Sequence, residues 1–414
     1  MKFLHLADTH IGIENYGRID ASTGLHTRLQ DFVASLRHAF ETAVQEQVDA
    51  VLFAGDAYRS CDPSPTHQRE FASQVRRLVD ADIPVVMVTG NHDSPVSFGK
   101  ATSLDIFGTL QTAGVHVANR DKLITLETKS GPLQVACLPW LHRSRLAAHS
   151  DYHKLDQEQI VAALQDLGAD LITGLAEQVD PAHPALLLAH VTAADAALSG
   201  TEQTALIGRD PVFLTSTLAH RAFDYIALGH IHRFQDLNPG GAPPVVYSGS
   251  IERIDFGEER EAKGFCLVSI EEAEPGQDVR RKVDYQFVSS PARTFRTIAV
   301  TVPDGADPTA VIVAEARNTD VTDAVVRVQY ELEGDDHPQL DLKAVAGALS
   351  EAFMVASIIA KPKPQAHLRR ADITPEAGLR EAIKAYVSNR PELEELEEEL
   401  ESAAMQLEAE RLGQ

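Results

Sequence analysis

The chain has 414 residues, of which 44% are hydrophobic and 24% are charged, and its formal net charge is −24. This length predicts roughly two or three domains. The acidic balance argues against a protein that binds nucleic acid through its overall charge, because such proteins usually carry a net basic face. Much of the negative charge is local, however, since residues 391–414 hold nine Glu against one Arg.

The cysteines and the apolar runs bear on the cellular compartment. Cys61, Cys137 and Cys266 are odd in number and widely spaced, which disfavours a disulfide framework or a thiolate zinc site and favours a reducing compartment. The N-terminal segment is too short and too soon interrupted for a signal peptide, and no apolar run approaches the length of a membrane span. We therefore expect a soluble, cytoplasmic protein that does not bind a membrane.

Strands and helices are expected to alternate through the first 290 residues. The apolar runs 3–7, 50–54 and 84–88 predict buried strands, and the amphipathic segments 26–47 and 66–79 between them predict helices. This alternation is typical of an α/β layered fold. The pattern continues with a helix at 103–111, strands near 115, 123 and 133–138, a helix at 156–178, and strands at 185–189, 225–228, 245–247 and 264–270.

The pattern changes near residue 291. Alternating β-branched runs and helix-like patches predict a small α+β domain over 291–365, with strands at 295–302, 324–332 and 353–360 and helices at 310–316 and 342–349. Residues 366–414 form the expected helical tail. Its last part spaces apolar residues at intervals of three or four among glutamates: Leu393, Leu396, Leu400, Ala403 and Leu407.

Five expected strand ends are followed by residues that can bind a metal. In chain order these are Asp8 and His10, Asp56, Asn91 with His92, His190, and His230 with His232. Because parallel strands present their carboxyl ends at one edge, we expect a single sheet to project the whole set together. Oxygen and imidazole donors without a thiolate suit Mn²⁺, Fe²⁺ or Zn²⁺ in an open hydrolytic site. Each motif alone is more often an ordinary turn, but the five together favour a metal site.

The number of donors indicates two ions. Seven ligands are too many for one catalytic ion with open positions, and Asp56, the lone carboxylate at its strand end, is the natural bridge. Two ions can activate water and neutralise the transition state of phosphoryl transfer. His92, next to Asn91 but outside the ligand count, is placed to protonate a leaving oxygen. For Asp93 two roles stay open, orienting His92 or closing the loop.

The series D-x-H, G-D, G-N-H-D, H and G-H-x-H resembles the calcineurin-like binuclear metallophosphoesterases over about residues 1–270. Segments 4–12, 225–232 and 247–250 are more narrowly similar to the nuclease subunits of SbcCD-type double-strand-break repair complexes. The resemblance implies a sandwich of two sheets flanked by helices (1–290), an α+β cap (291–365) and a helical tail (366–414). It also implies two divalent ions, expected to be Mn²⁺, with His92 as the transition-state histidine. One ion would be held by Asp8, His10, Asp56 and His232, and the other by Asp56, Asn91, His190 and His230.

The same resemblance implies an activity and partners. The activity is a Mn²⁺-dependent exonuclease and endonuclease at DNA ends and hairpins. The partners are DNA, an ABC-type ATPase subunit bound through the C-terminal helices, and a second copy in a heterotetramer, contacted through segments 66–79 and 103–111. For the tail, packing on its own domain or a solvated end is the alternative.

Arginines near the motifs are candidate DNA contacts, although a solvated or ion-paired arginine is the alternative for each. Arg59 departs from the family pattern, which commonly has Asp or His at that place. The candidates are Arg18, Arg59, Arg233 and Arg253, with Arg28, Arg293 and Arg296 beside them.

Two other functions stay open at this point. A phosphodiesterase or phosphatase for small molecules would share the metal site but would not need the cap and the tail. A non-catalytic scaffold that tethers DNA ends is disfavoured, because the set of expected ligands is intact.

Overall fold

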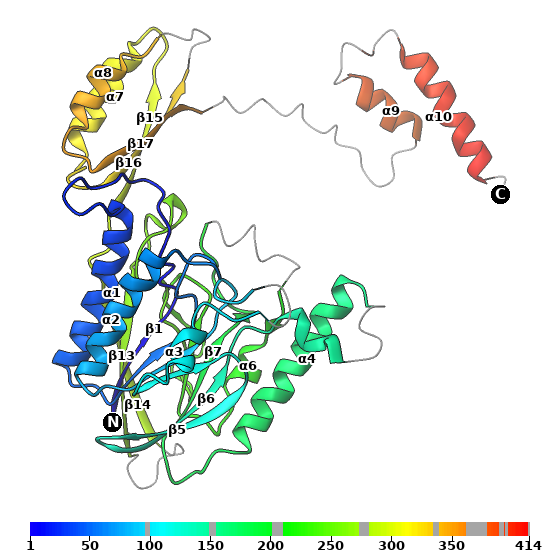
Figure 1. Cartoon of the computed structure of the whole chain (residues 1–414). Helices are drawn as coiled ribbons and strands as arrows, with labels where there is room; N and C mark the ends of the chain where they lie inside the picture. Colours follow the sequence, from blue (N-terminus) through cyan, green and yellow to red (C-terminus); the bar gives the residue numbers. More distant parts are fainter. Residues whose placement is uncertain are drawn as a thin grey trace.

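The computed structural model describes residues 1–95, 100–148, 155–200, 210–272, 281–333, 339–361, 379–388, 393 and 396–412. Two six-stranded sheets make up the first part of the chain, and helices cover their outer faces (Figure 1). The α/β sandwich expected from the resemblance is therefore confirmed.

The first sheet contains the N-terminal strands, in the order β14-β13-β1-β2-β3-β4. Strands β1 to β4 are parallel, whereas β13 and β14 pair antiparallel at one side. The pattern of apolar residues did not predict β14, whose exposed charged residues interrupt its apolar ones. The bounds are β1 Lys2–Leu6, β2 Ala50–Phe53, β3 Val85–Val88, β4 Val115–Ala118, β13 Gly264–Glu272 and β14 Arg281–Ser289.

The second sheet has the order β11-β12-β10-β7-β6-β5, with β6, β7, β10 and β12 parallel. The expectation of a single sheet is wrong, because the apolar composition of a strand does not reveal its pairing partner. The bounds are β5 Lys122–Thr128, β6 Gly131–Leu138, β7 Ala185–His190, β10 Tyr225–Gly229, β11 Gln235–Asp236 and β12 Val245–Tyr247. A separate short pair joins β8 Thr192–Ala193 to β9 Val212–Phe213.

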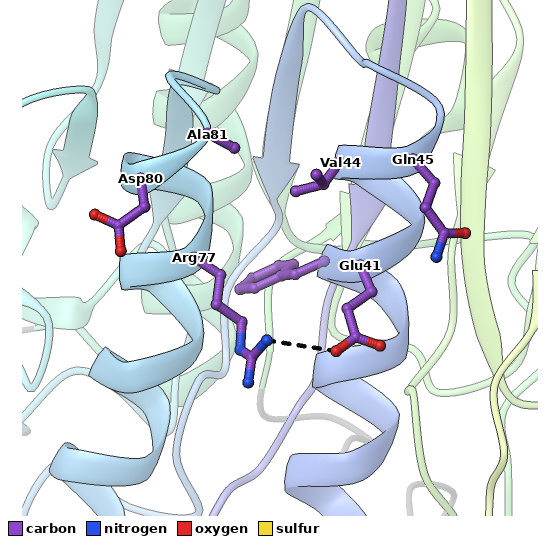
Figure 2. Close-up of a pocket in the computed structure, with 7 residues that line it drawn as sticks. Glu41, Val44, Gln45, Arg77, Asp80 and Ala81 are labelled. Carbon is purple, nitrogen blue, oxygen red and sulfur yellow. Dashed lines mark hydrogen bonds and ion pairs between the residues drawn. The ribbon is translucent and has the colours of Figure 1, made fainter.

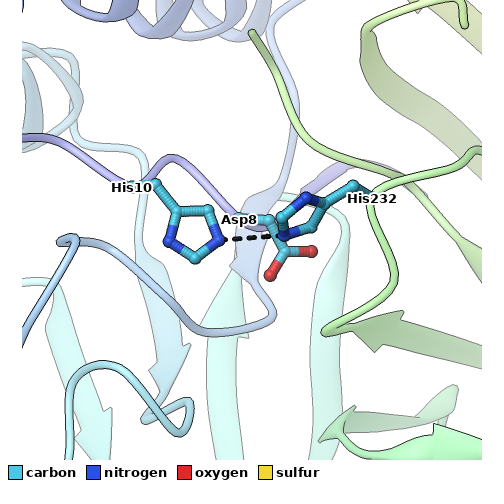
Figure 3. Close-up of side chains that lie close together, drawn as sticks. All are labelled: Asp8, His10 and His232. Carbon is cyan, nitrogen blue, oxygen red and sulfur yellow. Dashed lines mark hydrogen bonds between the residues drawn. The ribbon is translucent and has the colours of Figure 1, made fainter. Parts of the chain in front are cut away.

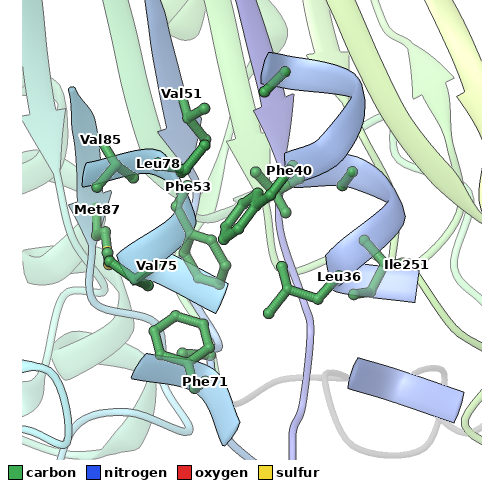
Figure 4. Packing of buried hydrophobic residues seen from close by; sticks show 14 of the residues in the cluster. Leu36, Phe40, Val51, Phe53, Phe71, Val75, Leu78, Val85, Met87 and Ile251 are labelled. Atoms are coloured by element: carbon green, nitrogen blue, oxygen red, sulfur yellow. The ribbon is translucent and has the colours of Figure 1, made fainter. Parts of the chain in front are cut away.

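Alternate residues of each strand face different cores. In β2, Leu52 faces the other sheet, whereas Val51 and Phe53 face the helices on the outside. Helices α1 Thr27–Gln45, α2 Pro65–Asp80 and α3 Asp105–Thr109 cover this outer face. Figure 4 shows Phe40 of α1 and Phe71 of α2 among the residues packed against the sheet. Both sheets are thus buried on two faces, which fixes their strand ends in space.

Helices α1 and α2 lie side by side and enclose a shallow pocket between them. Phe40 lines this pocket, and Figure 2 shows Val44 beside it with an ion pair between Arg77 Nη1 and Glu41 Oε1, which are 3.4 Å apart. Ser64 begins α2, because its hydroxyl accepts the backbone N–H of His67 and Pro65 takes the first helical position.

The second sheet is covered by α4 Gln157–Ala176 and the short α6 Thr215–Leu218, with the 3-10 helix η1 Arg143–Ala148 nearby. Asp156 caps α4, since its carboxylate accepts the backbone N–H of Gln159 while the Gln159 side chain accepts that of Asp156. The sandwich therefore has helices on both outer faces.

The cap is a three-stranded parallel sheet in the order β15-β16-β17 with its own core. Its elements are β15 Phe295–Val302, α7 Pro308–Asn318, β16 Val325–Leu332, α8 Leu342–Ala348 and β17 Met354–Ala360. Phe295 packs against Phe256 of the 3-10 helix η3 (Phe256–Glu258), with ring centroids 5.0 Å apart. This contact ties the cap to the loop that follows β12.

The tail contains α9 Leu379–Ser388 and α10 Glu397–Leu412. Glu401 of α10 forms ion pairs of 3.7 Å with Arg380 and Lys384 of α9. Leu396 and Leu400 of the expected apolar stripe are exposed, and the side chain of Leu407 lies outside the described residues. None of the helices in the described ranges combines the length and apolar composition that crossing a bilayer requires.

Candidate metal centre

The seven expected metal ligands converge where strands of the two sheets end. Asp8, Asp56 and Asn91 follow β1, β2 and β3 of the first sheet. His190 ends β7 and His230 follows β10 of the second sheet. Because the two sheets stack, their carboxyl ends meet and bring these side chains into one cluster.

One group consists of Asp8, His10 and His232 (Figure 3). A ligand atom of each lies within 4.8 Å of the others, and the Nε2 atoms of His10 and His232 are 3.0 Å apart. The Asp8 carboxylate also accepts the backbone N–H of His230, at 3.0 and 3.1 Å. This hydrogen bond connects the first sheet to the loop after β10.

A second group consists of Asp56, His190 and His230, with Asn91 between the two imidazoles. Asn91 Oδ1 lies 3.0 Å from both His190 Nε2 and His230 Nδ1. His190 Nδ1 is 2.7 Å from the carbonyl of Ala54 and donates to it, which leaves Nε2 facing the cluster.

Asp56 lies between these two groups and also forms a third group with His10 and the exposed His92, whose ligand atoms lie within 4.8 Å of one another. Its Oδ2 atom is 3.7 Å from His10 Nε2 and 3.5 Å from His190 Nε2. Its Oδ1 atom accepts the backbone N–H of His92 at 2.9 Å. A carboxylate in this position can contact an ion in each group.

The donor set fits divalent cations. Nε2 of His190 faces the oxygens of Asn91 and Asp56. Although burial opposes it, Asp56 raises the pKa of His190 to about 9, so a proton occupies this position when no ion is bound. A divalent cation can take the place of that proton, and oxygen and imidazole donors are the ligands that Mn²⁺, Fe²⁺ and Zn²⁺ accept. The residues thus form a centre that can hold metal.

Burial shifts the acid–base behaviour of the cluster. Burial lowers the pKa of His10 and His230 well below the usual value, so both imidazoles are neutral at pH 7 and keep a lone pair. Burial also raises the pKa of Asp8 to about 7, against the opposing effect of His190 and His232. A buried carboxylate of this kind is stabilised by a cation, which favours metal binding.

The backbone at the site is strained. Four of the expected ligands have positive φ angles, 53° at Asp8, 40° at His10, 57° at Asp56 and 100° at His230. Non-glycine residues seldom adopt this region, and such strain persists where surrounding contacts impose it. Position 90 requires glycine, because a Cβ atom there would collide with the Asp56 carboxylate.

His92 lies at the exposed side of the cluster. Its Nδ1 is 2.8 Å from the carbonyl oxygen of Arg59, to which it donates, and its ring centroid is 4.9 Å from that of His10. Because Nδ1 is engaged in this hydrogen bond, Nε2 is the ring nitrogen that can contact a substrate, and the exposed ring is accessible to one. The catalytic role of His92 remains a prediction.

Asp93 closes the loop. Its carboxylate accepts the backbone N–H groups of Gly90, Asp56 and Ala57 at 3.0, 2.8 and 3.1 Å, and that of Tyr58 at 3.4 Å. Of the two roles left open for this residue, loop closure matches its contacts. Asp93 thereby holds the strand ends of β2 and β3 together.

Two residues near the metal centre were missed by the sequence analysis. The buried Glu258 carboxylate is 2.7 Å from His232 Nδ1. Trp140, the one tryptophan of the chain, has its ring centroid 4.9 Å from that of His230. Neither residue belongs to a metal-binding motif, and both reach the site only through the tertiary fold.

The candidate DNA-binding arginines fall into two classes. Arg28 is buried and donates to Asp31, and Arg253 donates to the carbonyls of Ala292, Arg293 and Glu261, so both hold the junction with the cap. Arg293 is paired with Asp31 in the same junction. The exposed arginines are Arg18, whose guanidinium lies 5.8 Å from the Phe353 ring, and Arg59, Arg233 and Arg296.

An α/β sandwich that gathers donors for divalent cations where its strands end has the architecture of a metal-dependent phosphoesterase. Residues 1–234 match the family described as calcineurin-like phosphoesterase, and the chain belongs to that family.

Several relatives are nucleases by name. The SbcD component of the SbcCD nuclease of Escherichia coli (strain K12) is 29% identical over 65% of this chain and 65% of its own length. The corresponding nuclease component of Rhodobacter capsulatus is 31% identical over 60% of this chain and 62% of its own length. The DNA double-strand break repair protein Mre11 of Thermoplasma acidophilum is 25% identical over 66% of this chain and 62% of its own length. The matched region therefore spans less than two thirds of each relative.

Proposed function

We propose that this protein is a metal-dependent DNA nuclease that hydrolyses phosphodiester bonds at DNA ends and hairpins with two Mn²⁺ ions. The observation that carries the proposal is the position of Asp56, whose Oδ2 lies between His10 at 3.7 Å and His190 at 3.5 Å. This arrangement offers two adjacent ion sites with a shared carboxylate. The relatives named as nucleases supply the substrate class.

In the proposed reaction, water attacks the phosphorus atom and the bond to the leaving oxygen breaks. The bound ions would supply activation of water and neutralisation of charge on the phosphoryl oxygens. In the imidazolium form, with a proton on each ring nitrogen, His92 gives its Nε2 proton to the leaving oxygen while Nδ1 keeps the hydrogen bond to Arg59 O that orients the ring. Asn91 contributes an oxygen without negative charge, which keeps the site attractive to phosphate.

Arg59 and Arg233 are the proposed DNA contacts closest to the site in sequence. Arg59 precedes the Pro-rich loop before α2, and its backbone holds His92, while Arg233 follows His232 directly. In the part of the chain that the structure describes, neither side chain has an ion pair. Exposed guanidinium groups at the edge of a phosphoesterase site suit backbone phosphates. Arg18, which lies against the cap residue Phe353, is a further proposed DNA contact. Arg253 is not proposed as a DNA contact, because its guanidinium donates to backbone carbonyls at the junction with the cap.

The proposed partners are an ABC-type ATPase and a second copy of the chain, in a heterotetramer active in double-strand-break repair in the cytoplasm. Exposed Leu396 and Leu400 give the tail an apolar surface for the ATPase. An apolar groove between α2 and α3, with exposed Ile106 and Leu110 beside Val79, gives a surface for the second copy.

The proposal is tested by degradation of linear duplex DNA in Mn²⁺, with and without the ATPase subunit. We expect His92→Gln to lower the rate by about 10²-fold or more, within the range for removal of a general acid. His183→Gln is the matched control, because His183 precedes β7 and so lies at the opposite end of that strand from the site.

The same experiment separates the alternative functions. Quenching of Trp140 fluorescence by Mn²⁺ checks that His92→Gln still binds metal, since Trp140 packs on His230. If the wild-type protein hydrolyses bis(p-nitrophenyl) phosphate but leaves DNA intact, the protein is a phosphodiesterase for small molecules. If it binds metal and DNA but cleaves neither substrate, the scaffold function replaces the nuclease.

A further inference from the structure

His232 is held at its ring and at its backbone by the same pair of buried residues. Its Nδ1 lies 2.7 Å from Glu258 Oε1, and its carbonyl oxygen accepts Lys263 Nζ at 3.1 Å. Because Nδ1 donates to the carboxylate, the lone pair of the neutral ring is on Nε2. That nitrogen is the one that faces His10, 3.0 Å away.

Glu258 is itself held rigidly. Its Oε2 atom accepts the backbone N–H of Ile254 at 2.9 Å and lies 3.0 Å from Lys263 Nζ. The side chains of Glu258 and Lys263 are 1% and 0% exposed. A buried carboxylate and ammonium are costly unless each is paired and hydrogen-bonded, as both are here.

We propose that Glu258 is a positioning residue, which fixes the tautomer and ring orientation of His232 for a metal ion shared with Asp8 and His10, and that Lys263 locks Glu258 in place. The inference deepens the proposed function and rests on its metal sites. Removal of a carboxylate that accepts the second ring N–H of a metal-bound histidine typically weakens metal binding about 10- to 100-fold.

A purely structural role for Glu258 makes a different prediction. The residue lies in η3, two positions after Phe256 and directly before Glu259, and Glu259 accepts the backbone N–H of the cap residue Thr297 at 2.9 Å. If Glu258 served only to hold the cap junction, its loss would lower stability and would affect both ion sites alike. A positioning role affects the His232 site and leaves the Asn91–His190 site occupied.

The test is Mn²⁺ titration of the full chain, followed by electron paramagnetic resonance, which separates free ions, single bound ions and spin-coupled pairs. We expect two bound ions and a coupled signal in the wild type. In Glu258→Gln we expect one ion to stay tight and the other to weaken by about 10- to 100-fold, with loss of the coupled signal. Glu261→Gln is the matched control, since Glu261 contacts Lys263 at 3.0 Å but not His232, and should keep the coupled pair.

A second variant tests whether the loss of metal binding in Glu258→Gln arises from a folding defect. Glu258→Gln leaves Lys263 with a weaker set of partners, so the double variant Glu258→Gln/Lys263→Met removes that buried charge as well. We expect the double variant to recover thermal stability but not the second ion. Two tight ions in Glu258→Gln, or recovery of both stability and the coupled signal in the double variant, would overturn the positioning role alone. A wild-type chain that binds no Mn²⁺ would overturn this inference together with the proposed function.

Discussion

At the scale of single residues, the geometry of the metal centre depends on side chains that touch no substrate. The Asp93 carboxylate accepts backbone N–H groups from both sides of the cluster, at Gly90 on one side and at Asp56 and Ala57 on the other. It is fully buried. Asp56 therefore keeps its strained φ of 57° because Asp93 holds the loop around it.

Replacement of Asp93 by Asn should loosen this loop. The amide keeps one acceptor oxygen but turns an NH₂ group toward backbone donors, so we expect the free energy of unfolding to fall by about 2 kcal/mol, the scale of hydrogen bonds to a charged group. Urea denaturation measures this change. Ser103→Ala is the control, because it removes only the 3.2 Å hydrogen bond from the Ser103 hydroxyl and should cost about 1 kcal/mol or less. Equal stability of Asp93→Asn and wild type would contradict the loop-holding role.

At the scale of elements, α1 does more than cover the first sheet. Its residue Asp31 accepts Arg293 Nε at 2.8 Å, and Arg293 stands in the linker that joins β14 to the cap strand β15. The same carboxylate accepts Arg28 Nη1 at 2.8 Å, and the Arg28 side chain is fully buried. The cap is thus attached to the sandwich through a charged network, whose arginines the sequence pattern had suggested as DNA contacts.

Asp31→Ala should weaken the attachment of the cap. The substitution leaves Arg28 buried with Glu252 at 3.6 Å as its remaining carboxylate, and we expect a loss of about 3 kcal/mol, the scale for breaking a buried pair. Unfolding in urea and tryptic cleavage at Arg293 measure the effect. Asp323→Asn, which removes the charge of the 75% exposed partner of Arg293 and keeps a residue type that tolerates the φ of 55° at this position, should change stability by about 0.5 kcal/mol or less. If the Asp31 variant is as stable and protease-resistant as wild type, the network does not attach the cap.

At the scale of the whole molecule, the sequence predicted strands and their ends better than it predicted pairings. Asp8, Asp56 and His190 could be assigned to strand ends because apolar runs precede each of them, and a run of this kind is a local signal. Which strands share a sheet depends on contacts between distant segments, so the single-sheet expectation was wrong. Strand β14 was missed because exposed Lys282, Asp284 and Gln286 alternate with its apolar residues, so no continuous apolar run marks it.

The neighbours of the metal centre could not be predicted for the same physical reason. Glu258 lies 26 positions from His232, and nothing in the intervening sequence indicates that the loop after β12 folds back onto the ring. Arg28 was a candidate DNA contact with an ion-paired arginine as the alternative, and the structure shows the ion pair. Its burial could not be predicted, because burial of a guanidinium depends on a carboxylate supplied by the fold. Motif residues can be recognised in the sequence, whereas the residues that position them can be identified only from the tertiary structure.

The last prediction concerns assembly of two copies through the groove between α2 and α3. Ile106 and Leu110 are 49% and 69% exposed beside this groove, an apolar surface that a second copy would bury. We expect the wild type to sediment as a dimer and Ile106→Glu/Leu110→Glu as a monomer, because burying carboxylates without partners opposes association. Val44→Glu, which places a carboxylate in the pocket between α1 and α2 instead, should stay dimeric (Figure 2). Dissociation by Val44→Glu but not by the double variant would move the interface to the α1–α2 face, and a monomeric wild type would remove the dimer from the proposed function.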